Sequence, residues 1–162
     1  MLPFLSVHKL GCLLLALMLI SQIAAQAGGE ADGIVGVWTT AEGKSQVQIS
    51  RDKDHYAGKI ISLKEPNWPA SDEQGMGGKP KNDRHNPDAK LRSRPIVGLQ
   101  LMAGFKYAEK NTWDSGQVYD PESGKTYKGK LYLTSTNQLE LRGYVGVPLF
   151  GRTEVWHRAP AQ

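Results

Sequence analysis

The stretch that decides the fold is Gly36-Val37-Trp38, together with its counterpart Trp156-His157-Arg158 near the other end of the chain. A tryptophan on an opening strand and a cation on a closing strand attract each other, because the positive charge packs on the face of the indole ring. If Trp38 and Arg158 meet in this way, the first and last strands lie side by side. The sheet then closes on itself as a barrel, and a closed barrel has an interior.

Between these motifs, apolar residues recur at every second position, which is the period of a strand with one face in the core. Leu139 and Leu141 alternate with Glu140 and Arg142 in this way. Similar alternation runs through 45–49, 130–133 and 153–156, and turn-forming residues separate the runs at 42–43, 52–54, 109–111, 121–124 and 135–137. No helical period is sustained for ten residues. The sequence predicts an all-β domain, a single small antiparallel up-and-down barrel of about eight strands, with a two-sheet sandwich as a poorer fit.

Residues 1–27 have the pattern of a secretory signal peptide. His8 and Lys9 precede an uncharged apolar run from Leu10 to Ile20, and Ala25-Gln26-Ala27 matches a cleavage site for signal peptidase. The run is shorter than the roughly 18–20 residues that span a bilayer. We expect cleavage after Ala27, export to the periplasm or the medium, and no transmembrane segment afterwards.

The remaining residues, 28–162, have the length of one domain. They contain no cysteine, which excludes disulfides, thiolate metal sites and a cysteine nucleophile, and an exported protein of this kind is typical of a bacterial periplasm. His55, His85 and His157 lack the spacing of metal ligands. The sequence therefore predicts no metal and no cofactor, and it offers no phosphate-binding or hydrolase motif. Nucleic acid is not an expected partner, because the basic residues lie in one loop without interleaved aromatics.

A long irregular loop is predicted over residues 64–95, which have five prolines and three glycines. Its second half, 79–94, carries six Lys and Arg against two Asp, a net charge of +4, whereas residues 28–162 as a whole carry +3. Loops of this length tend to be functional or disordered. The loop is a candidate lid, a candidate interface or a solvated excursion.

Arg92 and Arg94 are the strongest candidates for a ligand site in this loop. Two arginines two apart on an extended segment point the same way, which suits a carboxylate or a phosphate. The alternative is that one or both of them pair with Asp83 or Asp88 and fasten the loop.

Several blocks of the chain resemble the Domain of Unknown Function 2147 family of exported bacterial proteins. The blocks are 79–88 with Asp83 and Asn86, 91–99, 113–127 with Tyr119 and Asp120, and 141–156 with Arg142, Tyr144 and Trp156. The resemblance covers nearly all of Ile34 to Arg158 and implies export, one compact β domain and a shared site of unknown purpose. The Gly-x-Trp motif with Arg158 also resembles the closure of calycin and lipocalin barrels, although the long loop follows about the third strand here and no helix follows the barrel.

Each remaining candidate has a structural alternative. Asp120 and Glu122 belong to a predicted turn in which Asp120 caps the backbone. The alternative is that Asp120 and Glu122 act as a catalytic acid or base. Arg142 and Tyr144 share one strand face, and Trp156 shares another with Glu154 and Arg158. The sequence does not say which faces point inward. The ligand-binding candidates are Asp83, Asn86, Arg92, Arg94, Tyr119, Asp120, Arg142, Tyr144 and Trp156, and barrel closure is assigned to Trp38 and Arg158.

Three classes of function are compatible with these features. The favoured one is a non-enzymatic exported domain that binds a small anionic or amphiphilic molecule at the mouth of the barrel. The second is a structural or partner-binding module of the bacterial cell envelope, with the long loop as the contact surface. The third is an enzyme that uses Asp83, Asp120 or Glu122 as acid or base.

Overall fold

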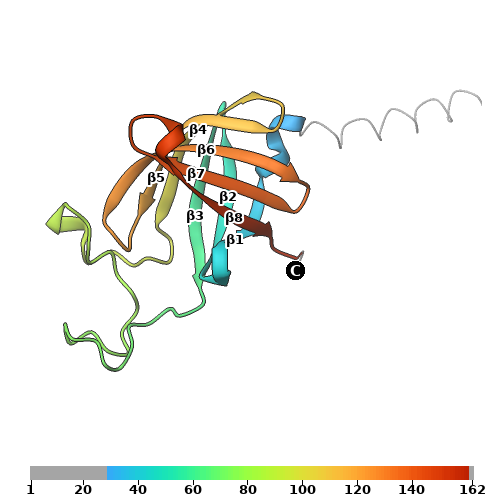
Figure 1. Cartoon of the computed structure of the whole chain (residues 1–162). Coiled ribbons are helices and arrows are strands. Elements are labelled where there is room, and N and C mark those ends of the chain that lie inside the picture. Colours follow the sequence, from blue (N-terminus) through green and yellow to red (C-terminus); the bar gives the residue numbers. More distant parts are fainter. Residues whose placement is uncertain (1–28, 161–162) are drawn as a thin grey trace, which may run out of the picture.

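A computed structural model of the chain describes residues 29–160. Within them, eight antiparallel strands form one closed barrel, in which each strand pairs with the next and the last pairs with the first (Figure 1). The predicted all-β up-and-down barrel of about eight strands is confirmed. The predicted signal peptide, 1–27, lies outside the described residues. The strands are β1 (Gly36–Thr39), β2 (Ser45–Asp52), β3 (His55–Leu63), β4 (Gln100–Glu109), β5 (Thr112–Asp120), β6 (Lys125–Ser135), β7 (Gln138–Tyr144) and β8 (Arg152–Arg158).

The side-chain alternation of β7 shows which face of the sheet is inside. Leu139 and Leu141 are buried in the core, whereas Glu140 and Arg142, which alternate with them, lie on the outer face. The apolar face therefore fills the barrel, as hydrophobic burial requires.

Strand β8 has the opposite character, because its polar positions point inward. Trp156 is buried in the core, and Glu154 and Arg158, two positions away on either side, share its face. Val155 lies on the outer face and is partly exposed. The closing strand thus brings a carboxylate and a guanidinium to the two ends of the barrel interior.

One end of the barrel is closed by Arg158. Its guanidinium carbon lies 4.2 Å from the ring centroid of Trp38, the packing that the two terminal motifs predict. The same guanidinium donates hydrogen bonds to the carbonyl oxygens of Gly33 at 2.6 Å, Thr136 at 2.8 Å and Val35 at 3.0 Å. Because β1 and β8 are paired at only two positions, these bonds hold much of the seam together.

A short 3₁₀-helix, η3 (Glu30–Ile34), covers this closed end. Two core tryptophans anchor it through their indole nitrogens. Trp38 Nε1 donates to the carbonyl of Ile34 at 2.8 Å, and Trp113 Nε1 donates to that of Ala31 at 3.0 Å. Each buried indole N–H is therefore satisfied, which burial of a polar group requires.

The middle of the barrel is packed tightly around Phe105. Its ring lies against Gly116 of β5 and Gly129 of β6, where a Cβ atom would overlap the ring. Glycine at these two inward positions makes room for the aromatic side chain.

The segment between β3 and β4 is the long loop, and Figure 1 shows it extending away from one end of the barrel. It contains one 3₁₀-helix, η5 (Ala89–Leu91), and two isolated bridges, which join Asn67 to Pro80 and Asn82 to Pro95. Two further 3₁₀-helices lie in other connections, η4 (Ala41–Gly43) and η6 (Pro148–Phe150). No helix within residues 29–160 is long and apolar enough to cross a membrane.

Candidate functional site

The barrel is open at the end opposite to Arg158, where β3, β5 and β7 finish. A cavity of about 1120 Å³ enters the interior from this end, and we call it the lumen cavity. Its volume is at the upper end of the roughly 300–1,000 Å³ of small-molecule sites. The barrel is thus packed at one end and hollow at the other.

The lumen cavity has an apolar interior and a charged rim. Ile60, Val118, Leu141 and Trp156 line its deeper part. The rim carries charges of both signs, from the cations Lys44, Lys64, Lys81 and Arg152 and the acids Glu42, Glu65, Asp120, Glu122 and Glu154. The long loop forms one side of the mouth through Trp68, Lys81, Asn82, His85 and Ile96.

Arg152 and Glu154 bring polar groups of β8 to this cavity, and the prediction of site residues from sequence did not include them. Glu154 Oε2 accepts a hydrogen bond from Trp156 Nε1 at 3.3 Å. The sequence feature that could have identified Glu154 is its position on the same strand face as Trp156. Its inward direction depends on the register with β7, where Leu139 lies opposite Trp156.

A second group of candidate residues gathers around Asp83, which is fully buried. Asp83 Oδ1 accepts the hydroxyl of Tyr119 at 2.6 Å. Its Oδ2 accepts Asn86 Nδ2 at 2.8 Å and two nitrogens of Arg94, each at 2.8 Å. We call Asp83, Asn86, Arg94 and Tyr119 the Asp83 cluster. It joins the long loop to β5.

The hydroxyl of Tyr119 is held as a proton donor in this cluster. Burial and the hydrogen bond to the Asp83 carboxylate raise the pKa of Tyr119 to about 12. The nearby guanidinium of Arg94, 5.7 Å from the ring centroid, acts in the opposite direction but is outweighed. Tyr119 therefore stays neutral across the physiological pH range.

The Asp83 cluster has the geometry of a fastening rather than of a catalytic site. Both oxygens of Asp83 are occupied by donors of the chain itself. Next to it, the turn between β5 and β6 approaches the loop so closely that a Cβ at Gly124 would overlap the carbonyl oxygen of His85. Loop and barrel are therefore packed together on both sides of the cluster.

The two candidate arginines, Arg92 and Arg94, do not form a parallel pair for an anion. Arg94 forms an ion pair with Asp83, and Arg92 Nε donates to the carbonyl oxygen of Asn86 at 2.8 Å. The alternative in which these residues fasten the loop is the one that the geometry shows. Another loop cation, Arg84, pairs with Asp72 at 2.8 Å and stacks 3.1 Å above the ring centroid of Trp68.

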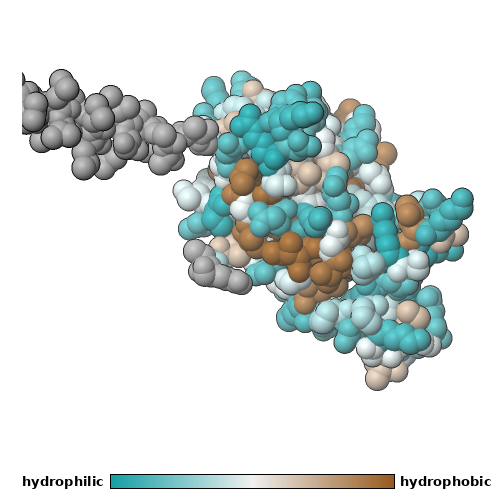
Figure 2. Space-filling view, turned by 180° about the vertical axis from the view of Figure 1, so that it is seen from behind, coloured by the Kyte–Doolittle hydropathy of each residue, from teal (hydrophilic) through white to brown (hydrophobic). Residues whose placement is uncertain are grey.

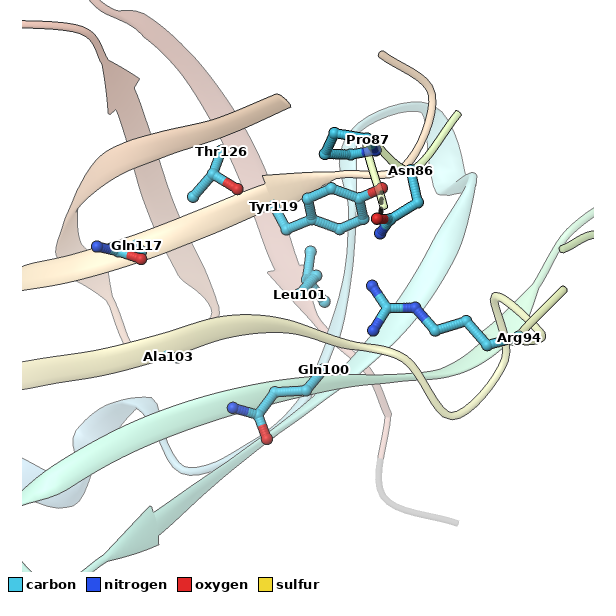
Figure 3. A pocket seen from close by; sticks show the side chains of 9 residues that line it. All are labelled: Asn86, Pro87, Arg94, Gln100, Leu101, Ala103, Gln117, Tyr119 and Thr126. Carbon is cyan, nitrogen blue, oxygen red and sulfur yellow. Dashed lines mark hydrogen bonds between the residues drawn. The ribbon is translucent and has the colours of Figure 1, made fainter. Parts of the chain in front are cut away.

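An outer groove of about 320 Å³ lies beside the Asp83 cluster, between the loop and the outside of β4 and β5. Figure 3 shows Arg94 extending toward Tyr119 and Asn86 at one end of this groove. The rest of it is lined by Pro87, Gln100, Leu101, Ala103, Gln117 and Thr126 (Figure 3). The lining is a mixture of polar and apolar side chains, and its one charged side chain, Arg94, is already paired.

Two other candidates have structural partners. Asp120 Oδ1 accepts the backbone N–H of Glu122 at 2.9 Å, and its Oδ2 accepts the hydroxyl of Ser123 at 2.6 Å, so it caps the turn as the structural alternative predicts. Arg142 lies on the outer face, where it binds the carbonyl oxygens of Pro148 and Leu149 at 2.7 and 3.1 Å.

The structure therefore divides the predicted site residues into two places. Tyr119, Asp120, Tyr144 and Trp156 line the lumen cavity. Asp83, Asn86, Arg92 and Arg94 lie in the long loop, where they bind one another or Tyr119, and Arg142 supports the turn before β8. Within residues 29–160, no group of three or more His, Cys, Asp and Glu side chains could hold a metal ion.

The fold and the lumen cavity define an eight-stranded barrel of lipocalin-like architecture, and comparison with known proteins agrees. Residues 36–158 match the family described as "Uncharacterized protein conserved in bacteria (DUF2147)", and the chain belongs to that family. The resemblance seen in the sequence blocks is thereby confirmed. A search of curated proteins found no match.

Among solved structures, the chain is similar to protein HP1028 from Helicobacter pylori, described as belonging to the lipocalin family. The two are 25% identical, with a TM-score of 0.65, and the similarity covers 78% of this chain and 83% of that one. A redesigned β-barrel also matches at 16% identity over 82% of this chain and 96% of that one, with a TM-score of 0.39. The first of these supports the lipocalin-like fold.

Proposed function

We propose that this protein is a non-enzymatic binding barrel that takes an amphiphilic molecule, with its apolar part inside the lumen cavity and its polar head at the rim. The observation that supports this most directly is the lumen cavity itself, apolar within and charged at its mouth. Transfer of an apolar chain from water to such an interior is favourable by about 25 cal/mol per Å² of buried surface. Small-molecule binding is also a common use of barrels of this architecture.

Mixed charge at the rim favours an amphiphile with a polar or zwitterionic head over a simple anion. The rim holds four Lys and Arg side chains against five Asp and Glu side chains, so it has no excess of positive charge. Of the two arginines that raised the expectation of an anion, Arg94 is paired with Asp83 and Arg92 donates to the carbonyl oxygen of Asn86. Another loop arginine, Arg84, is paired with Asp72. We therefore narrow the expected ligand to the amphiphilic class.

We also propose that binding takes place outside the cytoplasm, in the periplasm or the medium. The support is the signal-peptide pattern of residues 1–27 and the absence of cysteine from residues 28–162.

The test uses two substitutions of the same kind, one inside the barrel and one outside. Val118→Trp places an indole in the lumen cavity, whereas Val155→Trp adds the same bulk to the outer face. The probe is pyrene-labelled lysophosphatidylethanolamine, titrated below its micellar concentration. We expect saturable binding of one probe by the wild type, unchanged binding by Val155→Trp and at least about tenfold weaker binding by Val118→Trp, because the cavity is filled.

Near-ultraviolet circular dichroism checks that each variant is folded, and Leu141→Phe replaces Val118→Trp if the latter is not. Unchanged binding by a folded cavity-filling variant, or no saturable binding by the wild type, would contradict the proposal.

A further inference from the structure

The turn between β7 and β8 presents four large apolar side chains to solvent. Val145, Val147, Leu149 and Phe150 are 73%, 53%, 78% and 80% exposed. Their cluster, which we call the apolar turn, lies within six residues of sequence. Single exposed apolar residues are ordinary on protein surfaces, but a contiguous group marks an interaction site.

Part of the backbone of the apolar turn is already hydrogen-bonded within the protein. Arg142 donates from Nε to the carbonyl oxygen of Pro148 at 2.7 Å and from Nη2 to that of Leu149 at 3.1 Å. Two backbone bonds close the turn, from Phe150 N to Val147 O at 3.3 Å and from Gly151 N to Pro148 O at 3.0 Å. Arg142 Nη1 also holds Thr153 Oγ1 at 2.8 Å. The turn therefore presents its side chains outward while the carbonyls of Val147, Pro148 and Leu149 are hydrogen-bonded within the protein.

This arrangement selects among possible partners. In hydrocarbon no water is available, so each backbone group that lacks a hydrogen bond makes transfer from water unfavourable. The bonds to the carbonyls of Val147, Pro148 and Leu149 lower this cost for the part of the turn that carries Leu149 and Phe150.

Positive charge flanks the apolar turn on the outer face of the barrel. Lys128 of β6 lies opposite Tyr144, and Lys130 lies opposite Arg142. Gly129 and Leu131 on the same strand are buried, so both lysines project outward. Lys130 Nζ lies 4.0 Å from a carboxylate oxygen of Asp114, so Lys128 supplies most of this positive charge. Apolar side chains beside a basic face are the combination with which peripheral proteins bind anionic bilayers.

The apolar turn is also continuous with the mouth of the lumen cavity. Val145 and Phe150 line that cavity as well as being exposed. A turn inserted among lipids would place the open end of the barrel against the bilayer. An acyl chain could then pass between the bilayer and the lumen without crossing water.

We infer that the apolar turn is a docking site for an anionic lipid bilayer, and that it brings the lumen cavity to its ligand. The second part of this inference rests on the proposed function, whereas bilayer docking itself does not.

The test is co-sedimentation with vesicles of phosphatidylethanolamine and phosphatidylglycerol, using protein that begins at Gly28. That form lacks the apolar residues 1–27 and retains all eight strands and the buried core. In the variant, Leu149 and Phe150 are both replaced by Ser. The control replaces Ile61 and Val97 by Ser, which removes two exposed apolar side chains elsewhere, 40% and 41% exposed. The control is needed because apolar side chains also gather on the face shown in Figure 2.

We expect the wild type and the control to bind vesicles, and the Leu149/Phe150 variant to bind at least about tenfold more weakly, since two side chains no longer enter the bilayer. Lys128→Glu should weaken binding to these vesicles and not to vesicles of neutral lipid. Equal binding by wild type and variant, loss of binding in the control instead, or no binding by the wild type would each overturn the inference. So would a dimer of the wild type that the variant disperses, because the turn would then bind a second copy.

The same proteins are titrated with the pyrene probe below its micellar concentration. Normal probe binding by the Leu149/Phe150 variant, with weak vesicle binding, supports both proposals. If the wild type binds vesicles but does not bind the probe, the proposed function is contradicted and the docking site is still supported.

Discussion

The two ends of this barrel are built from the same eight strands but have opposite properties. At one end, Arg158 stacks on Trp38 and binds three backbone carbonyls, and η3 covers the opening. At the other end, a cavity of about 1120 Å³ is surrounded by charges of both signs. The difference shows that the packed core and the cavity are separated along the barrel axis.

The separation follows from where the large side chains lie. Trp38, Trp113 and Phe105 fill the interior between the closed end and the middle. Smaller side chains such as Ile60 and Val118 line the open end. The packed part supplies the burial that keeps the barrel closed, so the other end can remain hollow.

The largest expected effect is the loss of an aromatic ring at the closed end. Trp38→Ala should lower the free energy of unfolding by about 3–5 kcal/mol, because it leaves a cavity in a fully buried site. Leu141→Ala, beside the existing lumen cavity, should cost about 2 kcal/mol, at the low end of the range for leucine. Urea unfolding followed by circular dichroism measures both. Equal costs at the two sites would contradict the division of the barrel into a packed and a hollow end.

A smaller effect is expected for Arg158→Met. The variant keeps an apolar stem over Trp38 but loses the charged hydrogen bonds to Gly33, Val35 and Thr136. A hydrogen bond to a charged group contributes about 1.5–3 kcal/mol. Because water can bind some of the carbonyls that Arg158 leaves free, we expect the free energy of unfolding to fall by about 2–3 kcal/mol in total. Arg152→Met at the open rim is the matched control and should change stability by less than about 0.5 kcal/mol. A loss from Arg152→Met as large as that from Arg158→Met would mean that the rim also stabilises the fold.

The smallest effect concerns the attachment of the long loop at the open end. Tyr119 has a pKa of about 12 in the folded protein, against 10.0 for an ordinary tyrosine. Because the folded pKa is the higher one, the stabilisation by its hydroxyl is fully present below about pH 10 and is lost as the pH rises toward 12. Tyr119→Phe should remove about 1.5 kcal/mol of stability near neutral pH and flatten this alkaline decline.

A spectrophotometric titration of tyrosine ionisation, with Tyr127→Phe as the control, checks the assignment. Burial also raises the pKa of Tyr56 and of Tyr107, so several tyrosines ionise late. Tyr119→Phe should lose one late-ionising tyrosine, whereas Tyr127→Phe should keep all of them. Identical titration curves for wild type and Tyr119→Phe would show that the hydroxyl is not bound to Asp83 as the structure has it.

The closed end was more predictable from sequence than the open end. Trp38 and Arg158 lie in short motifs at the ends of the domain, and alternation of the kind seen at Leu139 and Leu141 predicts strands directly. These signals are local, and an up-and-down topology needs only neighbouring strands to pair. The fold could therefore be predicted with its strand number and closure.

The site was less predictable because it depends on which way each face points. Trp156 and Glu154 share a face, but the register of β8 against β7 decides that they point inward. Arg94 was predicted as a possible anion ligand from its spacing with Arg92. Its ion pair with Asp83, eleven residues earlier, requires the loop to fold back between Asn82 and Pro95, a long-range contact that spacing does not encode.

Native mass spectrometry of the protein tests most directly whether the lumen cavity holds an amphiphile. Wild type and Val118→Trp are purified without detergent and measured before and after denaturation and refolding. We predict an added mass on the wild type that disappears on refolding and is absent from Val118→Trp. A clean mass for the gently purified wild type, or the same added mass on folded Val118→Trp, would contradict a lumen that holds an amphiphile.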